Sequence, residues 1–294
     1  MKALESTTSI AFNNILFLTD FTRETEAAFS YALALARHYQ ARVYPAHAIV
    51  PFLPTELEVP VMPDIIKQVE KEKRNALAGL VSQTGLKYEA LTTTDAIETA
   101  VPKWINEHGI DLIVMGTHGR RGLQRLLLGS TAETIFRTAT CPVLTVGPAV
   151  RRQPEEGLKI KRILFATDLS KPTEYAAGYA LSFAQEYGAR VTFLHVLPPK
   201  NRTHAELSSE AAIARNELRE LVPPEIGDKC EVEFVVAEGN PAERILGMAE
   251  EKSVDLIVLG LPKDKTFSTH FRSGVTYEVV SSATAAVLTM RSQW

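Results

Sequence analysis

Short runs of apolar, often β-branched residues alternate along the chain with longer segments in which apolar residues recur every three or four positions. The short runs are typical of buried strands and the longer segments of amphipathic helices, and their alternation is typical of βαβ units with a parallel sheet. In the first half, strands are predicted near residues 14–19, 42–48, 87–91, 111–116 and 142–146. Helices are predicted over residues 22–38, 64–83, 95–108 and 130–138, with Thr22 capping the first.

The second half repeats the first. Aligning Ile15 with Ile163 gives about half identical positions without a gap as far as His47 and His195, which indicates a tandem duplication. Strands are predicted again near residues 161–167, 190–196, 231–236, 255–260 and 285–290. We therefore expect an α/β fold of two tandem open five-stranded parallel sheets, flanked by helices and related by an approximate two-fold axis. The expected domains are residues 1–150 and 158–294.

Two segments interrupt this regular order. Residues 147–157 are rich in proline, glycine and charge, and are predicted to link the halves. Residues 50–63 contain four prolines and cannot be regular helix or strand throughout. This second segment is either a flap over a binding site or a passive surface insertion.

A glycine-rich segment runs from Gly116 to Thr131, between a predicted strand and a predicted helix. Such a loop offers anion binding, because glycine lets the backbone approach a phosphate and the helix start presents free amides. Its spacing of Gly116, Gly119 and Gly129 matches neither GxxxxGK[ST] nor GxGxxG. The segment predicts a site for a nucleotide or another phosphate ester.

This segment resembles the signature of the ATP-binding universal stress proteins. The resemblance extends to residues 15–22, 47–49 and 141–146, which are similar to strands of that family. It implies that ATP, ADP or AMP, with magnesium, binds beyond the carboxyl ends of the strands. The implied nucleotide-binding residues are Leu18, Thr19, Asp20, Ala48, Met115, Gly116, His118, Gly119, Arg120, Gly129, Ser130 and Thr131.

Several of these residues also have a purely structural interpretation. Without contacting any ligand, Ser130 could serve as a helix cap, and Gly119 and Gly129 could serve as turn residues. Asp20 could cap the helix that follows it. Arg120 could simply be solvated, as could Arg121 and Arg125. The histidines of this region show no metal-ligand spacing.

The corresponding loop of the second half departs from the signature. Pro262 removes a backbone amide, Lys263 replaces the second glycine, and the terminal Gly-Ser becomes Ser273-Gly274. We therefore expect the second half to bind a nucleotide weakly or not at all.

Composition narrows the alternatives. The chain has 294 residues, 45% hydrophobic residues and a net charge of −3, which fits two globular domains and disfavours nucleic acid as a partner. The sequence shows no signal peptide and no apolar run long enough to span a bilayer, so a cytoplasmic location without membrane contact is expected. Cys141 and Cys230 have no CxxC spacing and are expected to be ordinary thiols.

Binding is better supported by the sequence than reaction. The leading hypothesis is a stress-response regulator or sensor that binds an adenine nucleotide. A slow ATPase or autophosphorylating protein, or a structural interaction protein with a vestigial site, stays open because no convincing catalytic set accompanies Asp20. The resemblance also implies pairing of the two halves through residues 143–146 and 286–290, and a homodimer is possible.

Overall fold

The computed structural model describes residues 10–22, 25–49, 63–117, 129–150, 154, 157–227, 230–261 and 274–291. The first half contains, in order, β1 (Asn14–Leu18), α1 (Glu26–Tyr39), β2 (Arg42–Ala48), α2 (Pro63–Val81), β3 (Leu91–Thr93), α3 (Ile97–His108), β4 (Leu112–Gly116), α4 (Ser130–Thr138) and β5 (Val143–Val146). The second half contains β6 (Arg162–Thr167), α5 (Lys171–Tyr187), β7 (Arg190–Leu197), α6 (His204–Glu220), α7 (Pro224–Gly227), β8 (Val232–Glu238), α8 (Pro241–Glu251), β9 (Leu256–Leu261), α9 (Val275–Ser282) and β10 (Ala286–Arg291).

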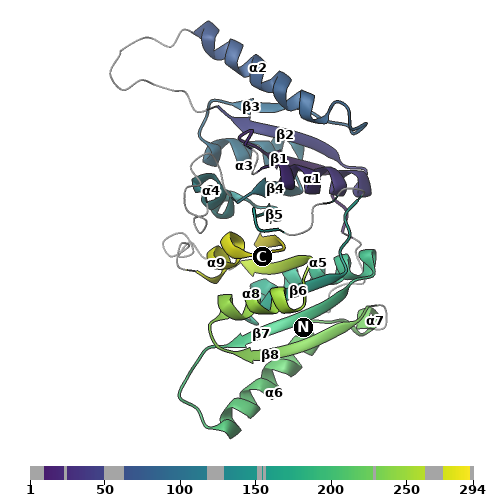
Figure 1. Cartoon of the computed structure of the whole chain (residues 1–294), viewed down its shortest axis with the longest axis vertical. Coiled ribbons are helices and arrows are strands. Elements are labelled where there is room, and N and C mark those ends of the chain that lie inside the picture. Colours follow the sequence, from purple (N-terminus) through teal and green to yellow (C-terminus); the bar gives the residue numbers. More distant parts are fainter. Residues whose placement is uncertain are drawn as a thin grey trace, which may run out of the picture.

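All these strands belong to one ten-stranded sheet in the order β3-β2-β1-β4-β5-β10-β9-β6-β7-β8. Within each half the strands are parallel, and helices lie on both faces of the sheet (Figure 1). The predicted α/β class is confirmed, with one refinement. The two five-stranded units join edge to edge, so the sheet is continuous through the molecule.

Each face of the sheet carries its own apolar core, because successive side chains of a strand point to opposite faces. Ile15 and Phe17 are buried on the face covered by α1 and α5, whereas Leu16 is buried on the face covered by α3, α4, α8 and α9. Both cores include residues of both halves. The halves therefore share their cores as well as their sheet.

The seam between the halves is the antiparallel pair of β5 and β10, in which Leu144 lies opposite Leu288. On either side of this pair, the Thr145 hydroxyl donates to the Val287 carbonyl at 3.1 Å and the Thr289 hydroxyl donates to the Val143 carbonyl at 3.3 Å. Both threonines are buried, and each hydroxyl is satisfied across the seam. This reciprocal arrangement is what a two-fold relation between the halves produces.

At the amino ends of the strands, one carboxylate in each half holds two chain segments together. Asp111 accepts hydrogen bonds from the backbone amides of Asn13 at 2.7 Å and Asn14 at 3.1 Å. Asp255 accepts the equivalent bonds from Lys161 and Arg162 at 2.9 and 3.0 Å. The sequence Asp-Leu-Ile-Val, which occurs at residues 111–114 and again at 255–258, therefore begins in both halves with a carboxylate that stabilises the amino edge of the sheet.

Two local expectations were wrong. The third strand was expected near residues 87–91, but regular pairing with β2 covers Leu91–Thr93 and only an isolated bridge forms at Tyr88. Threonine has high β propensity despite its polarity, which a search for apolar runs does not reveal. Thr22 does not cap α1 either, because Thr25 occupies the N-cap position and Thr22 bonds to Asp20 instead.

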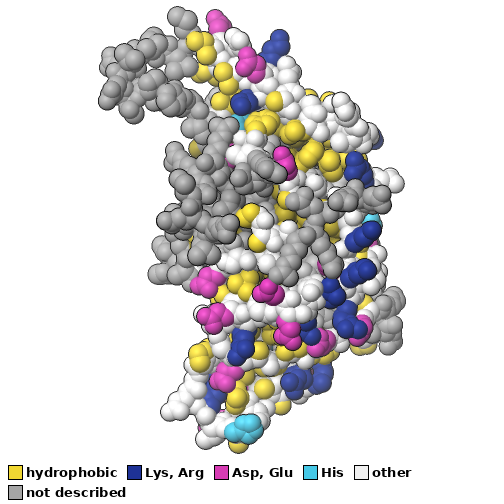
Figure 2. Space-filling view, in the orientation of Figure 1, with side chains coloured by type: hydrophobic (Ala, Val, Ile, Leu, Met, Phe, Trp, Pro, Cys, Tyr) yellow, Lys and Arg dark blue, Asp and Glu magenta, His cyan; other side chains and the backbone are white. Residues whose placement is uncertain are grey.

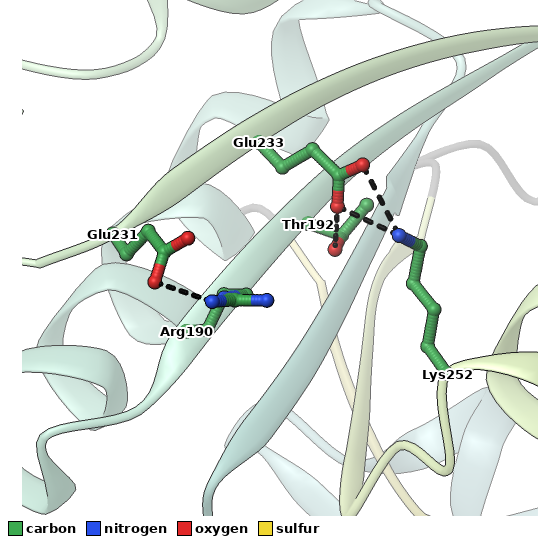
Figure 3. A network of polar contacts seen from close by, with 5 residues as sticks. All are labelled: Arg190, Thr192, Glu231, Glu233 and Lys252. Atoms are coloured by element: carbon green, nitrogen blue, oxygen red, sulfur yellow. Dashed lines mark hydrogen bonds and ion pairs between the residues drawn. The ribbon is translucent and has the colours of Figure 1, made fainter.

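The outer edge of the second half is reinforced by charged side chains (Figure 3). Glu233 of the edge strand β8 accepts hydrogen bonds from Lys252 Nζ at 2.8 and 3.1 Å and from the Thr192 hydroxyl at 3.0 Å. Beside it, Arg190 and Glu231 form an ion pair at 2.8 Å. Charges of this kind discourage edge-to-edge association of sheets. Figure 2 shows acidic and basic side chains interspersed over the lower half of the face it presents.

Candidate functional site

Three strand ends of the first half converge at one edge of the sheet. Leu18, the last residue of β1, pairs with Ala46 of β2 on one side and with Met115 of β4 on the other. The Thr19 amide continues this pairing by donating to the Ala46 carbonyl at 3.1 Å. The structure thus brings together the predicted residues that end these strands or directly follow them: Leu18, Thr19, Asp20, Ala48, Met115 and Gly116.

A tight turn follows β1 and fixes the carboxylate of Asp20. Its Oδ1 accepts hydrogen bonds from the Thr22 amide at 3.1 Å and from the Thr22 hydroxyl at 2.6 Å. The Thr19 hydroxyl accepts the amide of Phe21 at 3.0 Å, and Phe21 has a φ of 63°, an uncommon value for a residue other than glycine. Asp20 therefore has a structural role, but it stabilises its own turn and does not cap α1, whose N-cap residue is Thr25.

The same turn is present in the second half. Asp168 Oδ1 accepts the Ser170 amide and hydroxyl at 3.0 and 2.6 Å, and Leu169 has a φ of 60°. In both halves a histidine Nδ1 donates to the threonine carbonyl that precedes the aspartate, at 2.8 Å from His47 and 2.9 Å from His195. Both histidines therefore have a structural role, because each joins its strand to the end of the neighbouring strand.

Two residues near the first-half strand ends were not predicted from the sequence. The ring of Phe21 contacts that of His47, with 4.8 Å between centroids, and Lys73 Nζ of α2 lies 4.8 Å from the Phe21 centroid. This cation–π contact places a positive charge beside the turn. Phe21 is adjacent to the recognised aspartate, but no sequence signal places α2 next to the end of β1.

The start of α4 returns to the end of β4. The Gly129 amide donates to the Thr117 carbonyl at 3.0 Å, and Gly129 occupies the N-cap position with φ −63° and ψ 150°. Ser130 is the first helical residue, so its interpretation as the N-cap is wrong, and Thr131 is exposed. The first amides of a helix have no partner within it, so this end of α4 suits an anion. His118, Gly119 and Arg120 lie outside the described residues.

The second half differs at this position. Its last helix, α9, begins at Val275 with Gly274 as the N-cap, at φ −90° and ψ 154°. Both glycines therefore occupy the same position, but the residue that follows is serine in the first half and valine in the second. The side chain of Val275 is exposed.

Other chemistry is scarce in the part of the chain that the structure describes. No three histidine, cysteine, aspartate or glutamate side chains within it form a group that could hold a metal ion. Cys141 and Cys230 are both free, and burial raises the pKa of Cys141 to about 12. No helix in the described residues has the length and apolarity needed to cross a membrane.

Comparison with known proteins places this geometry in context. The profile of the Universal stress protein family matches residues 11–147 and 159–291. A universal stress protein of Mycolicibacterium smegmatis is 26% identical over 299 residues, covering 94% of this chain and 96% of the relative. One from Methanocaldococcus jannaschii is 30% identical over 139 residues, covering 46% of this chain and 82% of the relative. The crystal structure of a universal stress protein from Archaeoglobus fulgidus covers 96% of this chain and 97% of its own, with 19% identity and a TM-score of 0.69.

Proposed function

We propose that this chain, which belongs to the universal stress protein family, binds one adenine nucleotide at the first-half strand ends and acts as a cytoplasmic regulator or sensor. Membership of the family supports a stress-response role. The observation that carries the nucleotide proposal is the meeting of the ends of β1, β2 and β4 with the start of α4. Ligands of open parallel sheets bind at such an edge.

The residues at this edge suit the parts of a nucleotide. Leu18 and Met115, neighbours across β1 and β4, are buried apolar residues at this edge and would lie beneath a bound base. The α4 amides and the backbone at Gly116 suit phosphate oxygens. A magnesium ion would be held mainly by the phosphates of ATP, because Mg²⁺ usually binds substrate phosphates and keeps few protein ligands.

Binding is a better match for this site than fast phosphoryl transfer. Phosphoryl-transfer enzymes need a group that holds the metal and another that positions the nucleophile. Asp20, the carboxylate at this edge, uses Oδ1 for two bonds to Thr22. We therefore propose that nucleotide occupancy, rather than turnover, is the signal that the protein transmits.

Isothermal titration of ATP with magnesium into the intact chain tests this proposal. The expected stoichiometry is near one nucleotide per chain. Ligand at about 100 times its dissociation constant adds about 2.7 kcal/mol of stability by mass action. At about 2 to 4 °C per kcal/mol, the melting temperature should rise by several degrees. No binding heat and no shift with ATP, ADP or AMP would refute the proposal.

A matched pair of substitutions tests the location. Gly129→Val and Gly274→Val alter N-cap glycines whose backbone angles valine also adopts, so neither should strain the chain. Gly129→Val should weaken ATP binding at least tenfold, because the side chain would occupy the space where phosphate meets the start of α4. Gly274→Val should leave binding unchanged. Equal effects of the two substitutions would place the nucleotide elsewhere.

A further inference from the structure

The contact between the ends of α1 and α5 joins residues that the duplication makes equivalent. The gap-free alignment of the halves pairs His38 with Glu186, and in the structure His38 Nε2 lies 2.5 Å from Glu186 Oε1. Equivalent residues of a repeat meet directly only close to the axis that relates its copies. At this point two identical halves would bring two identical side chains together, whereas in this chain an imidazole meets a carboxylate.

The two tyrosines that follow these residues show the same asymmetry. Tyr39 and Tyr187 are also equivalent, and the Tyr39 hydroxyl donates to Glu186 Oε2 at 2.6 Å. The Tyr187 ring instead stacks on the His38 ring, with 5.0 Å between centroids. Its buried hydroxyl has no hydrogen-bond partner within the described chain. Because only Glu186 of the two equivalent positions carries a carboxylate, only the Tyr39 hydroxyl of the two equivalent hydroxyls has a hydrogen-bond acceptor.

A third difference lies one helical turn away. The amide of Ile10 donates to the Ser182 hydroxyl at 3.0 Å, which joins the start of the first half to α5. The alignment pairs Ser182 with Ala34, which has no hydroxyl. A second copy of the first half would therefore offer the Ile10 amide a methyl group in place of an acceptor.

We infer that the α1–α5 contact selects the partner of each half, so that the surface of the first half fits the second half and rejects another copy of itself. Between two second halves, Glu186 would meet another carboxylate, and like charges at contact distance repel. Between two first halves, two His38 side chains would meet without a carboxylate, and the Ile10 amide would lose its acceptor. Only the unlike pair satisfies these groups, and it is available within a single chain.

Substitutions in the full chain reproduce each rejected contact. His38→Glu places glutamate against glutamate, as two second halves would, and Glu186→His places histidine against histidine, as two first halves would. The double variant His38→Glu/Glu186→His restores an unlike pair with its orientation reversed. It also gives the Tyr187 hydroxyl a carboxylate at the equivalent position.

Urea unfolding of these variants at neutral pH measures the discrimination. We expect each single variant to lower the folding equilibrium constant, the ratio of folded to unfolded protein, about tenfold. The constant of the double variant should lie within about threefold of that of the unsubstituted chain. A double variant as unstable as the two single effects combined would overturn the inference. Single variants as stable as the unsubstituted chain would overturn it as well.

Ser182 supplies a test that leaves the His38–Glu186 pair unchanged. Ser182→Ala should lower the folding equilibrium constant about threefold, because the Ile10 amide loses its acceptor. Ser182→Thr retains a hydroxyl and should lower this constant less. If the variants at His38 and Glu186 do not fold, this pair of variants decides the question. Equal stability of Ser182→Ala and the unsubstituted chain would then contradict the inference.

Discussion

Removing the hydroxyl of Tyr39 should destabilise the protein, whereas the same deletion at the equivalent Tyr187 should not. Tyr39→Phe abolishes a 2.6 Å hydrogen bond to the Glu186 carboxylate. Tyr187→Phe removes a buried hydroxyl that has no partner within the described residues. Both substitutions retain the aromatic rings, including the stacking of Tyr187 on His38 and on Phe183. The comparison therefore isolates the hydroxyl groups.

The magnitude follows from the partners. A hydrogen bond to a charged group contributes about 1.5 to 3 kcal/mol, and Tyr39→Phe should cost about 1.5 because Glu186, 21% exposed, remains accessible to water. A buried polar group without a partner costs about 1 to 3 kcal/mol, so Tyr187→Phe should leave the stability unchanged or raise it by about 1 kcal/mol. At about 2 to 4 °C per kcal/mol, the melting temperature should fall by about 3 to 6 °C for Tyr39→Phe only.

Scanning calorimetry and urea titration of the two full-length variants measure this difference. A change in the urea midpoint with an unchanged slope would show that stability, and not compactness, has changed. Equal losses in both variants, or a larger loss in Tyr187→Phe, would refute the reasoning. Either result would mean that the two hydroxyls contribute alike, and the asymmetry around Glu186 would have no energetic consequence.

Two further predictions concern pH. Burial is the main cause that raises the pKa of Tyr39, Tyr179 and Tyr187 above the ordinary value of 10.0, so the folded state holds these protons more tightly than the unfolded state. The contribution of these tyrosines to stability should be fully present below pH 10 and should be lost as the pH rises beyond it. Urea midpoints and tyrosinate absorbance measured against pH would show this loss. A urea midpoint that does not change above pH 10 would contradict the prediction. The hydrogen bond from Lys252 is the main cause that lowers the pKa of Glu233, so its contribution should be present above its ordinary pKa of 4.5 and disappear as the pH falls through the lower folded value. Glu233→Gln should cost about 0.5 kcal/mol at neutral pH, since the pair is exposed, and the difference from the unsubstituted chain should vanish in acid; a difference that persists there would contradict the assignment.

The alternation of apolar runs and helical patterns was sufficient to predict the architecture of both halves. The strand β2 and the helix α4 occupy the predicted ranges, because β2 is a continuous buried run and α4 buries Ala132, Ile135 and Phe136 at helical spacing. The third strand was displaced because its pairing with β2 depends on threonines at positions 92 and 93. The short β3 is therefore set by a neighbouring strand rather than by its own hydropathy.

The candidate site was only partly predictable, for a related reason. Strand ends can be located from sequence, because parallel strands of one sheet end at the same edge, and Leu18 and Met115 meet there. The contact of Phe21 with Lys73 depends on how α2 packs across the sheet edge, which no local pattern encodes. The role of Asp20 in its own turn became evident only from the two bonds that it accepts.

Comparison of the two halves separates the features that each half needs in order to fold from the features that a ligand would require. Each half needs a fixed amino edge and a turn after its first strand to fold, and both retain them through Asp111 and Asp255 and through the bonded turns at Asp20 and Asp168. The halves differ where the last helix begins, because Ser130 follows Gly129 in the first half and the exposed Val275 follows Gly274 in the second. A difference at a helix start changes what that end of the helix can hold. This reasoning locates the proposed functional asymmetry at the start of α4.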